Sequence, residues 1–159
     1  MSQIIIDIAD GKVSNKPDDV LVTYSLGSCV GVAIYDPGVQ VGGIIHCMLP
    51  IASVDPQKAE VKPFMFVDSG MMKFLTMLFD LGVNRSRAII KVAGCARILD
   101  NSNLFRIGER NHTVLRKILW KNGLMIKAEQ VGGSLSRTLR LEIGSGRCTL
   151  RSSGVESEF

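Results

Sequence analysis

Two apolar runs joined by a turn signal constrain the fold of this chain more than any other feature. The runs span residues 29–35 and 39–49, and Asp36-Pro37-Gly38 lies between them. Proline fixes φ and glycine tolerates a positive φ, so this tripeptide favours a chain reversal. Both runs are rich in valine and isoleucine, which favour strands. The sequence therefore predicts a β-hairpin with Cys29 at its open end and His46 well along the returning strand.

The remaining segments predict two helices and further strands. Residues 66–81 repeat apolar side chains at helical intervals and are followed by Gly82, and a shorter helix is expected at residues 111–121. The other expected strands are residues 4–8, 20–24, 87–92, 124–128, 138–143 and 147–151. We expect Asp10-Gly11 to break the first strand and residues 50–63 to form a loop. This pattern is typical of a mixed α/β domain built in layers.

The length and composition favour one domain. A chain of 159 residues buries about two-thirds of its unfolded surface. We predict a single domain over residues 1–159, with a core at about 4–151 and a C-terminal tail at 152–159. No apolar run is long enough to cross a membrane, and the N-terminal residues lack the pattern of a signal peptide. We therefore expect no membrane insertion and a cytoplasmic location.

Charge is distributed unevenly along the chain. Residues 1–80 contain 5 Lys/Arg and 9 Asp/Glu, whereas residues 81–159 contain 14 and 6. A basic half of this kind can steer an acidic partner, although a solvated surface with ion pairs would show the same composition. Aromatic residues make up only 6% of the chain and have apolar neighbours, so we expect no nucleic-acid partner.

Cys29 is the first candidate for chemistry because Gly27-Ser28 precedes it. Glycine lets the backbone turn tightly, so that amide N–H groups can point at one spot. Such amides would lower the pKa of the thiol and would hold an oxyanion. The alternative is a buried, inert cysteine, which is the usual role of a lone thiol.

His46 is the second candidate, and the chain has only one other histidine, His112. Paired with Cys29, the imidazole of His46 would act as a base and proton shuttle. Thr23 would then orient the ring through a hydrogen bond. The alternative is a structural core histidine. His112 is expected near the surface, at the start of a helix.

A metal site would use the same atoms in a different way. Cys29, His46 and Cys47 offer suitable ligand atoms. Neighbouring strand residues point to opposite faces, however, so His46 and Cys47 cannot easily bind one ion. No fourth ligand has a suitable spacing, and the four cysteines contain no C-x-x-C pair. We therefore expect reduced thiols, no metal and no cofactor.

Four short motifs follow one another along the chain. They are Leu26-Gly27-Ser28-Cys29, His46 with Met48-Leu49-Pro50 after it, Ile107-Gly108-Glu109-Arg110-Asn111, and Gly132-Gly133 ahead of Arg137. Together they resemble the CheD family of chemoreceptor glutamine deamidases over roughly residues 6–151. Two positions depart from the family pattern: Cys95 stands where glycine is usual, and Gln130 stands where an acidic residue is usual.

The resemblance implies an α/β/β layered sandwich similar to the catalytic domain of cytotoxic necrotizing factor toxins. It implies Cys29 as nucleophile, His46 as base and Thr23 as the orienting residue. The Gly27-Ser28 step before Cys29 would shape the oxyanion site. The implied reaction hydrolyses glutamine side-chain amides of chemotaxis receptors to glutamate through a cysteine thioester. The implied partners are the cytoplasmic helical domains of these receptors and a CheC-type phosphatase.

Two other functions stay open. The first is a non-catalytic binding regulator of the CheC phosphatase, which would not need the thiol of Cys29. The second is a cysteine peptidase or transglutaminase-like enzyme, which would share the acyl-enzyme chemistry. Transfer of the acyl group to an added primary amine would distinguish a transglutaminase from a hydrolase.

Overall fold

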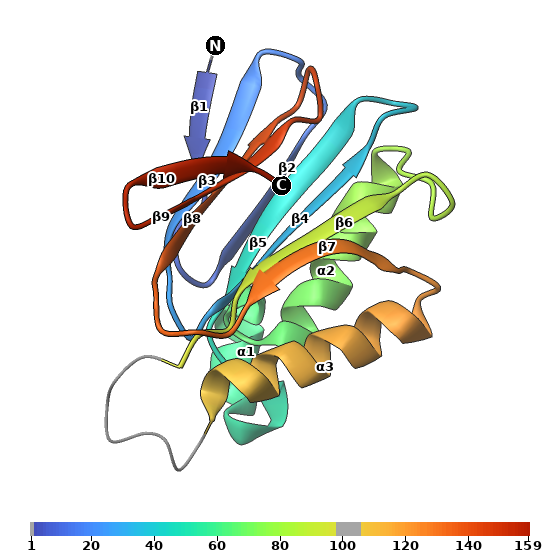
Figure 1. The fold of residues 1–159 in the computed structure, drawn as a ribbon. Helices are drawn as coiled ribbons and strands as arrows, with labels where there is room; N and C mark the ends of the chain where they lie inside the picture. Colours follow the sequence, from blue (N-terminus) through green and yellow to red (C-terminus); the bar gives the residue numbers. More distant parts are fainter. Residues whose placement is uncertain (1, 98–105) are drawn as a thin grey trace.

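The computed structural model describes residues 2–97 and 106–159, and these residues contain ten strands and three α-helices (Figure 1). The strands are β1 (Ser2–Ile5), β2 (Asp10–Ser14), β3 (Asp19–Leu26), β4 (Val30–Asp36), β5 (Val41–Cys47), β6 (Ile89–Gly94), β7 (Ile126–Val131), β8 (Arg137–Glu142), β9 (Cys148–Ser152) and β10 (Val155–Glu158). The helices are α1 (Pro56–Val61), α2 (Val67–Asp80) and α3 (Ile107–Lys121), with short 3-10 turns at Ala52–Val54 and Pro63–Met65.

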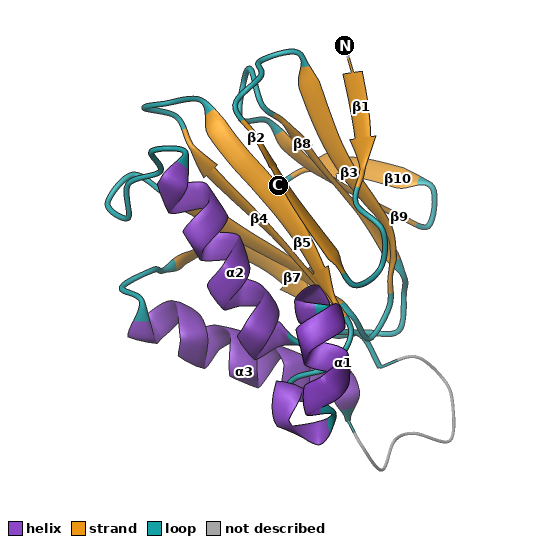
Figure 2. Ribbon diagram, turned by 180° about the vertical axis from the view of Figure 1, so that it is seen from behind, coloured by secondary structure: helices purple, strands orange, loops and turns teal. Residues whose placement is uncertain are grey.

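The strands form two five-stranded sheets that face each other. The central sheet has the order β2-β5-β4-β6-β7, and the outer sheet has the order β1-β3-β8-β9-β10. Figure 2 shows the helices on the side of the central sheet that faces away from the outer sheet. The layers are therefore helices, central sheet and outer sheet, which confirms the predicted α/β/β sandwich of a mixed α/β domain.

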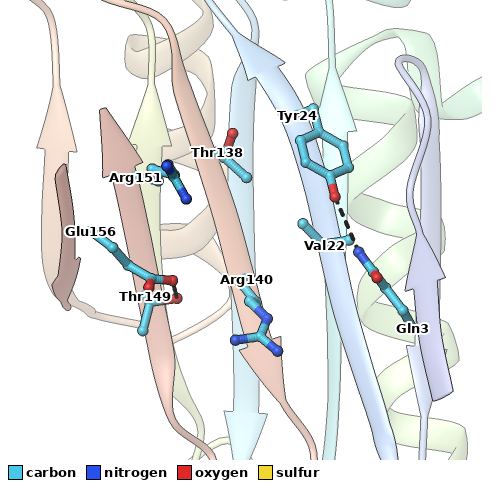
Figure 3. A pocket seen from close by; sticks show the side chains of 8 residues that line it. All are labelled: Gln3, Val22, Tyr24, Thr138, Arg140, Thr149, Arg151 and Glu156. Carbon is cyan, nitrogen blue, oxygen red and sulfur yellow. Dashed lines mark hydrogen bonds between the residues drawn. The ribbon is translucent and has the colours of Figure 1, made fainter. Parts of the chain in front are cut away.

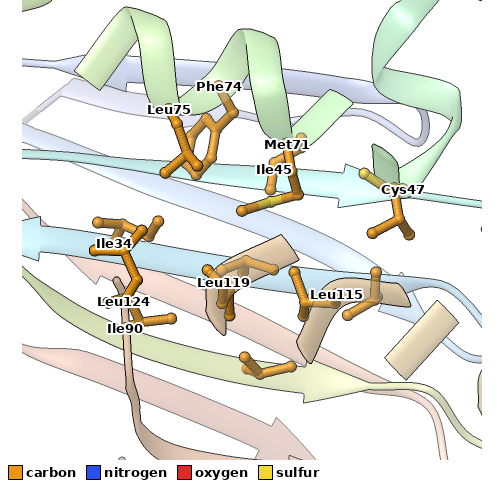
Figure 4. Close-up of a cluster of buried hydrophobic side chains, with 14 of the residues drawn as sticks. Ile34, Ile45, Cys47, Met71, Phe74, Leu75, Ile90, Leu115, Leu119 and Leu124 are labelled. Atoms are coloured by element: carbon orange, nitrogen blue, oxygen red, sulfur yellow. The ribbon is translucent and has the colours of Figure 1, made fainter. Parts of the chain in front are cut away.

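Each face of the central sheet has its own apolar core. On the helix side, Met71 and Phe74 of α2 and Leu115 and Leu119 of α3 pack against strand residues such as Ile45 (Figure 4). The neighbouring residue Ile44 belongs instead to the core between the two sheets. Successive residues of a strand point to opposite faces, so this alternation assigns a face to every residue of β5.

The predicted hairpin is confirmed. Strands β4 and β5 pair antiparallel, with Tyr35 opposite Gly42 near the turn and Gly31 opposite His46 near the open end. The first predicted helix is also confirmed as α2, and Gly82 follows it with a φ of 97°. Helix α3 begins at Ile107, four residues before its predicted start.

The expectation that Asp10-Gly11 breaks a strand is wrong, because strand β2 begins there. Asp10 pairs with His46 and Gly11 with Ile45 across the edge of the central sheet. A Cβ at Gly11 would lie 2.8 Å from the ring of Phe64, so this glycine allows close packing of the strand. Strand β1 correspondingly covers Ser2–Ile5 rather than residues 4–8.

The expected loop at residues 50–63 is also wrong, because it contains α1. The carboxylate of Asp55 accepts a hydrogen bond from the Lys58 N–H, and Pro56 occupies the first turn of the helix. Both features are typical of helix starts. At the C-terminus, residues 155–158 form strand β10, which pairs antiparallel with β9. Among the described residues, no helix has the length and apolar character needed to cross a membrane.

We predict that Phe74→Ala lowers the free energy of unfolding by roughly 3–5 kcal/mol, because the fully buried ring leaves a cavity between α2 and the central sheet. Urea denaturation followed by circular dichroism measures this change. Met72→Ala is the matched control, since Met72 lies on the same helix but is exposed. Its expected effect is within about 0.5 kcal/mol. Equal losses in both variants would contradict the assignment of the core.

Candidate active site

A buried hydrogen bond across the two sheets joins Thr23 of β3 to His46 of β5. Thr23 Oγ1 lies 2.7 Å from His46 Nδ1 and 2.7 Å from the carbonyl oxygen of Ile6. A carbonyl oxygen can only accept, so the single hydroxyl proton of Thr23 is donated to Ile6. Nδ1–H of His46 then donates to Thr23 Oγ1. These contacts assign the ring proton to Nδ1 and leave the lone pair on Nε2.

The other ring nitrogen of His46 is buried and has no hydrogen-bond partner within residues 2–97 and 106–159. Burial also lowers the pKa of His46 to about 4. The imidazole is therefore neutral near pH 7. A neutral ring with a free Nε2 lone pair can accept a proton from a nearby group.

The strand register places Cys29 on the same face as His46. Gly31 lies directly opposite His46, and Cys29 precedes Gly31 by two residues. Alternation puts both in the inter-sheet layer, where Cys29 is half-buried and packs against the apolar core. Diagonal neighbours of this kind have Cα atoms about 7–8 Å apart. The structure thus brings Thr23 and His46 into contact and places Cys29 on the same face of the central sheet, without a hydrogen bond to Nε2.

The expectation that backbone amides lower the pKa of the Cys29 thiol is wrong, because the net shift of this pKa is upward. Burial raises this pKa, and the N–H of Cys29 itself opposes the increase by a smaller amount. The thiol is therefore protonated at neutral pH. A neutral thiol becomes a nucleophile only when a base removes its proton, which is the chemistry that a free imidazole nitrogen offers.

The loop that carries Cys29 is held in place by hydrogen bonds that its backbone carbonyl oxygens accept. The N–H of Ala96 donates to the Gly27 oxygen over 2.9 Å, and the N–H of Cys95 donates to the Cys29 oxygen over 2.8 Å. Asn111 of α3 donates from Nδ2 to the Ser28 oxygen over 3.0 Å. These three bonds fix the orientation of three consecutive peptide planes around Cys29.

The segment behind this loop requires glycine at position 94. Gly94 has a φ of 102°, and a Cβ there would lie 2.3 Å from the Cys29 oxygen. The buried guanidinium of Arg137 donates from Nη1 to the Gly94 oxygen over 3.1 Å, and its Nε donates to Gln130 Oε1 over 3.3 Å. The unusual Cys95 follows directly and is buried, which raises the pKa of its thiol to about 12.

Asn111 and Arg137 are site residues whose roles the sequence analysis missed. Asn111 is fully buried and shares one stripe of α3 with Leu115 and Leu119, at intervals of four residues. A polar residue on an otherwise apolar stripe is a signal that could have identified it. His112, the next residue, lies near the surface as expected, and its Nε2 is 2.6 Å from Glu129 Oε1.

The two residues of β5 that were considered as metal ligands point to opposite sides of the sheet. His46 faces the outer sheet through Thr23, whereas Cys47 lies in the helix-side core, where burial raises the pKa of its thiol. Among the residues that the structure describes, no cluster of three or more His, Cys, Asp or Glu side chains is arranged to hold a metal ion.

A hollow of about 360 Å³ lies on the exposed face of the outer sheet (Figure 3). Its lining residues are Gln3, Val22, Tyr24, Thr138, Arg140, Thr149, Arg151 and Glu156. Val22 and Tyr24 flank Thr23 on β3 and point to the opposite face from it. The hollow is therefore separate from the group formed by Thr23, His46 and Cys29.

Comparison with known proteins gives consistent matches. The model of a family described as CheD chemotactic sensory transduction matches residues 48–152. A Solibacter usitatus protein named "Probable chemoreceptor glutamine deamidase CheD" is 48% identical over 159 residues, which are all of this chain and 94% of the relative. A Syntrophus aciditrophicus protein with the corresponding name is 48% identical over 97% of this chain and 96% of its own length.

Among solved structures, the Neisseria meningitidis protein NMB0706 aligns with a TM-score of 0.49 and 9% identity, covering 84% of this chain and 63% of that chain. The sequence matches, in contrast, extend over almost the whole chain at high identity. They confirm the resemblance that the four motifs indicated. The chain belongs to the CheD family.

Proposed function

We propose that this protein is a chemoreceptor glutamine deamidase in which Cys29 is the nucleophile, His46 the base and Thr23 the residue that orients the imidazole. The names of its close relatives support the activity. The observation that carries the residue assignment is the free, unprotonated Nε2 of His46 on the face that Cys29 shares. The receptor substrate suggests that the protein acts in the cytoplasm.

The reaction begins with proton transfer from the Cys29 thiol to His46 Nε2. The resulting thiolate attacks the side-chain amide carbon of a substrate glutamine, and a C–S bond forms while the carbonyl electron pair moves to oxygen. The backbone N–H groups of Ser28 and Cys29 hold this oxyanion. The Thr23 contact stabilises the imidazolium, because Nδ1–H continues to donate to Oγ1.

The tetrahedral intermediate then collapses to a thioester. The C–N bond breaks, and the proton on His46 Nε2 goes to the departing nitrogen, which leaves as ammonia. Water next gives a proton to Nε2 and attacks the thioester. The C–S bond breaks, the proton returns to the sulfur of Cys29, and the substrate keeps a carboxylic acid that ionises to glutamate.

Each turnover replaces a neutral amide with a negative charge on the receptor. On a helical bundle, this changes the repulsion between neighbouring acidic side chains and creates a new methylation site. The basic residues of 81–159 supply the complementary charge for an acidic receptor surface. Complex formation is then expected to weaken as ionic strength rises.

A CheC-type phosphatase is the second partner that family membership suggests. Binding of this kind does not require the thiol, so a Cys29→Ala variant would keep the partner while losing turnover. The half-buried position of Cys29 leaves part of the loop accessible to a protein surface. If the protein were a regulator without activity of its own, the unaltered protein and Cys29→Ala would bind the phosphatase equally. Neither of them would then deamidate the receptor.

We predict that Cys29→Ala lowers the rate of glutamine-to-glutamate conversion by at least about 10³-fold, because no other group can form the thioester. The measurement is peptide mass spectrometry of a chemoreceptor cytoplasmic fragment incubated with each protein. Cys148→Ala is the matched control, since Cys148 is buried in the inter-sheet core on β9. Undiminished conversion by Cys29→Ala would exclude Cys29 as the nucleophile.

We predict that Thr23→Val lowers kcat by about 10- to 100-fold, since valine has nearly the same shape but offers Nδ1–H no acceptor. Thr23→Ser retains the hydroxyl and is expected to keep most of the activity. Steady-state kinetics on the same receptor fragment measures both variants. If valine and serine behaved alike, the hydrogen bond between Thr23 and His46 would have no part in catalysis.

The pH dependence of kcat/KM tests the state of the base. His46 must be neutral in the free enzyme, and its pKa is lowered to about 4, so activity is expected to fall only when the pH approaches that value. The profile is expected to be flat between about pH 5 and about pH 8. An acid limb centred near the ordinary histidine value of 6.5 would contradict this assignment.

A further inference from the structure

The side chain of Asn111 joins the two segments that carry the proposed nucleophile and base. Its Nδ2 donates to the carbonyl oxygen of Ser28, just before Cys29, over 3.0 Å. The same nitrogen donates to the carbonyl oxygen of Met48, two residues beyond His46, over 3.0 Å. One amide on α3 therefore contacts the nucleophile loop and the end of the strand that carries the base.

The orientation of this amide follows from its partners. Both are carbonyl oxygens, which only accept, so the amino group and not Oδ1 must face them. The two hydrogens of Nδ2 are then both used. Oδ1 is buried and has no partner within residues 2–97 and 106–159. A leucine would extend the apolar stripe of α3 without this unpaired oxygen, so packing alone does not account for asparagine.

The hydrogen bond to Ser28 also determines where the N–H of Cys29 points. The Ser28 carbonyl and the Cys29 N–H belong to one trans peptide unit, in which the two groups point in opposite directions. Because the Ser28 oxygen points to Asn111, the Cys29 N–H points away from α3. It lies close enough to the Cys29 sulfur to oppose the effect of burial on the thiol.

The peptide between Gly27 and Ser28 is arranged in the same way, but a backbone group holds it instead of a side chain. The Gly27 oxygen accepts from the N–H of Ala96, so the Ser28 N–H also points away from its partner segment. In the described part of the chain, neither the Ser28 N–H nor the Cys29 N–H donates a hydrogen bond to another residue. The two peptide units that precede the Cys29 side chain thus each have a free donor, and only the Cys29 donor is oriented by a side chain.

We propose that Asn111 is a positioning residue that orients the Cys29 N–H to bind the oxyanion. This inference rests on the proposed deamidase function and adds to it a residue that contacts neither thiol nor imidazole. Asn111 acts through the Ser28 peptide. Its loss lets that peptide rotate, which removes one donor from the transition state while the thiol and the imidazole stay in place.

The test compares turnover with a reaction that forms no oxyanion. The kcat and KM of Asn111→Ala are measured on the receptor fragment, and the alkylation rate of Cys29 by iodoacetamide is measured by mass spectrometry. We expect kcat to fall about 10²-fold, the usual effect of losing one oxyanion donor. We expect KM to change by less than about twofold and alkylation by less than about threefold, because substrate binding and the thiol are untouched.

Two further variants separate positioning from general stability. Tyr35→Phe removes a buried hydrogen bond to the Ile143 oxygen near the far end of β4, and it is expected to keep its kcat. Asn111→Leu extends the apolar stripe of α3 and has no amino group to donate to Ser28. Its kcat is expected to fall as much as that of Asn111→Ala. It replaces Asn111→Ala in the test if that variant does not fold.

Three results would overturn the inference. The first is a kcat for the folded Asn111 variants close to that of the unaltered protein. The second is a parallel loss of turnover and alkylation, which would mean that Asn111 only keeps the loop folded. The third is an equal loss in Tyr35→Phe. Absence of turnover in the unaltered protein, with Cys29 still alkylated, would instead refute the deamidase function and the inference that rests on it.

Discussion

The hydrogen bond between Thr23 and His46 is the constraint on which the proposed chemistry of this fold depends. It forms only because the central and outer sheets pack face to face and bring β3 against β5. Burial between the sheets keeps the imidazole neutral, and the bond then decides which nitrogen holds the proton. The protonation state of the proposed base is therefore a property of sheet packing, established before any substrate binds.

The proposed nucleophile is organised in a different way. Cys29 lies just outside β4, and the surrounding peptide planes are held by the segment that follows β6 and by α3. The helical layer thus contributes to the site although it lies on the far side of the central sheet from His46. Its contribution is a single buried amide that reaches the end of the sheet, where the strands no longer satisfy one another's carbonyl groups.

The sequence predicted the elements whose signals are local. Asp36-Pro37-Gly38 specified the hairpin, which in turn placed Cys29 and His46 at one end. Strand β2 was missed because it is a polar edge strand, paired only through β5 and recognisable only from tertiary structure. The raised pKa of the Cys29 thiol was missed because desolvation depends on three-dimensional burial. The bonds from Asn111 join residues more than sixty positions apart, a separation that no local pattern records.

The acceptor for the Thr23 hydroxyl is the main-chain oxygen of Ile6. Every amino acid carries such an oxygen, so replacement of the side chain at position 6 leaves the proton arrangement of His46 unchanged as long as β1 keeps its register. A one-residue shift of this segment against β3, in contrast, would move the Ile6 oxygen away from Thr23. The proton arrangement of His46 therefore depends on the alignment of this backbone segment with β3 and not on which side chain position 6 carries.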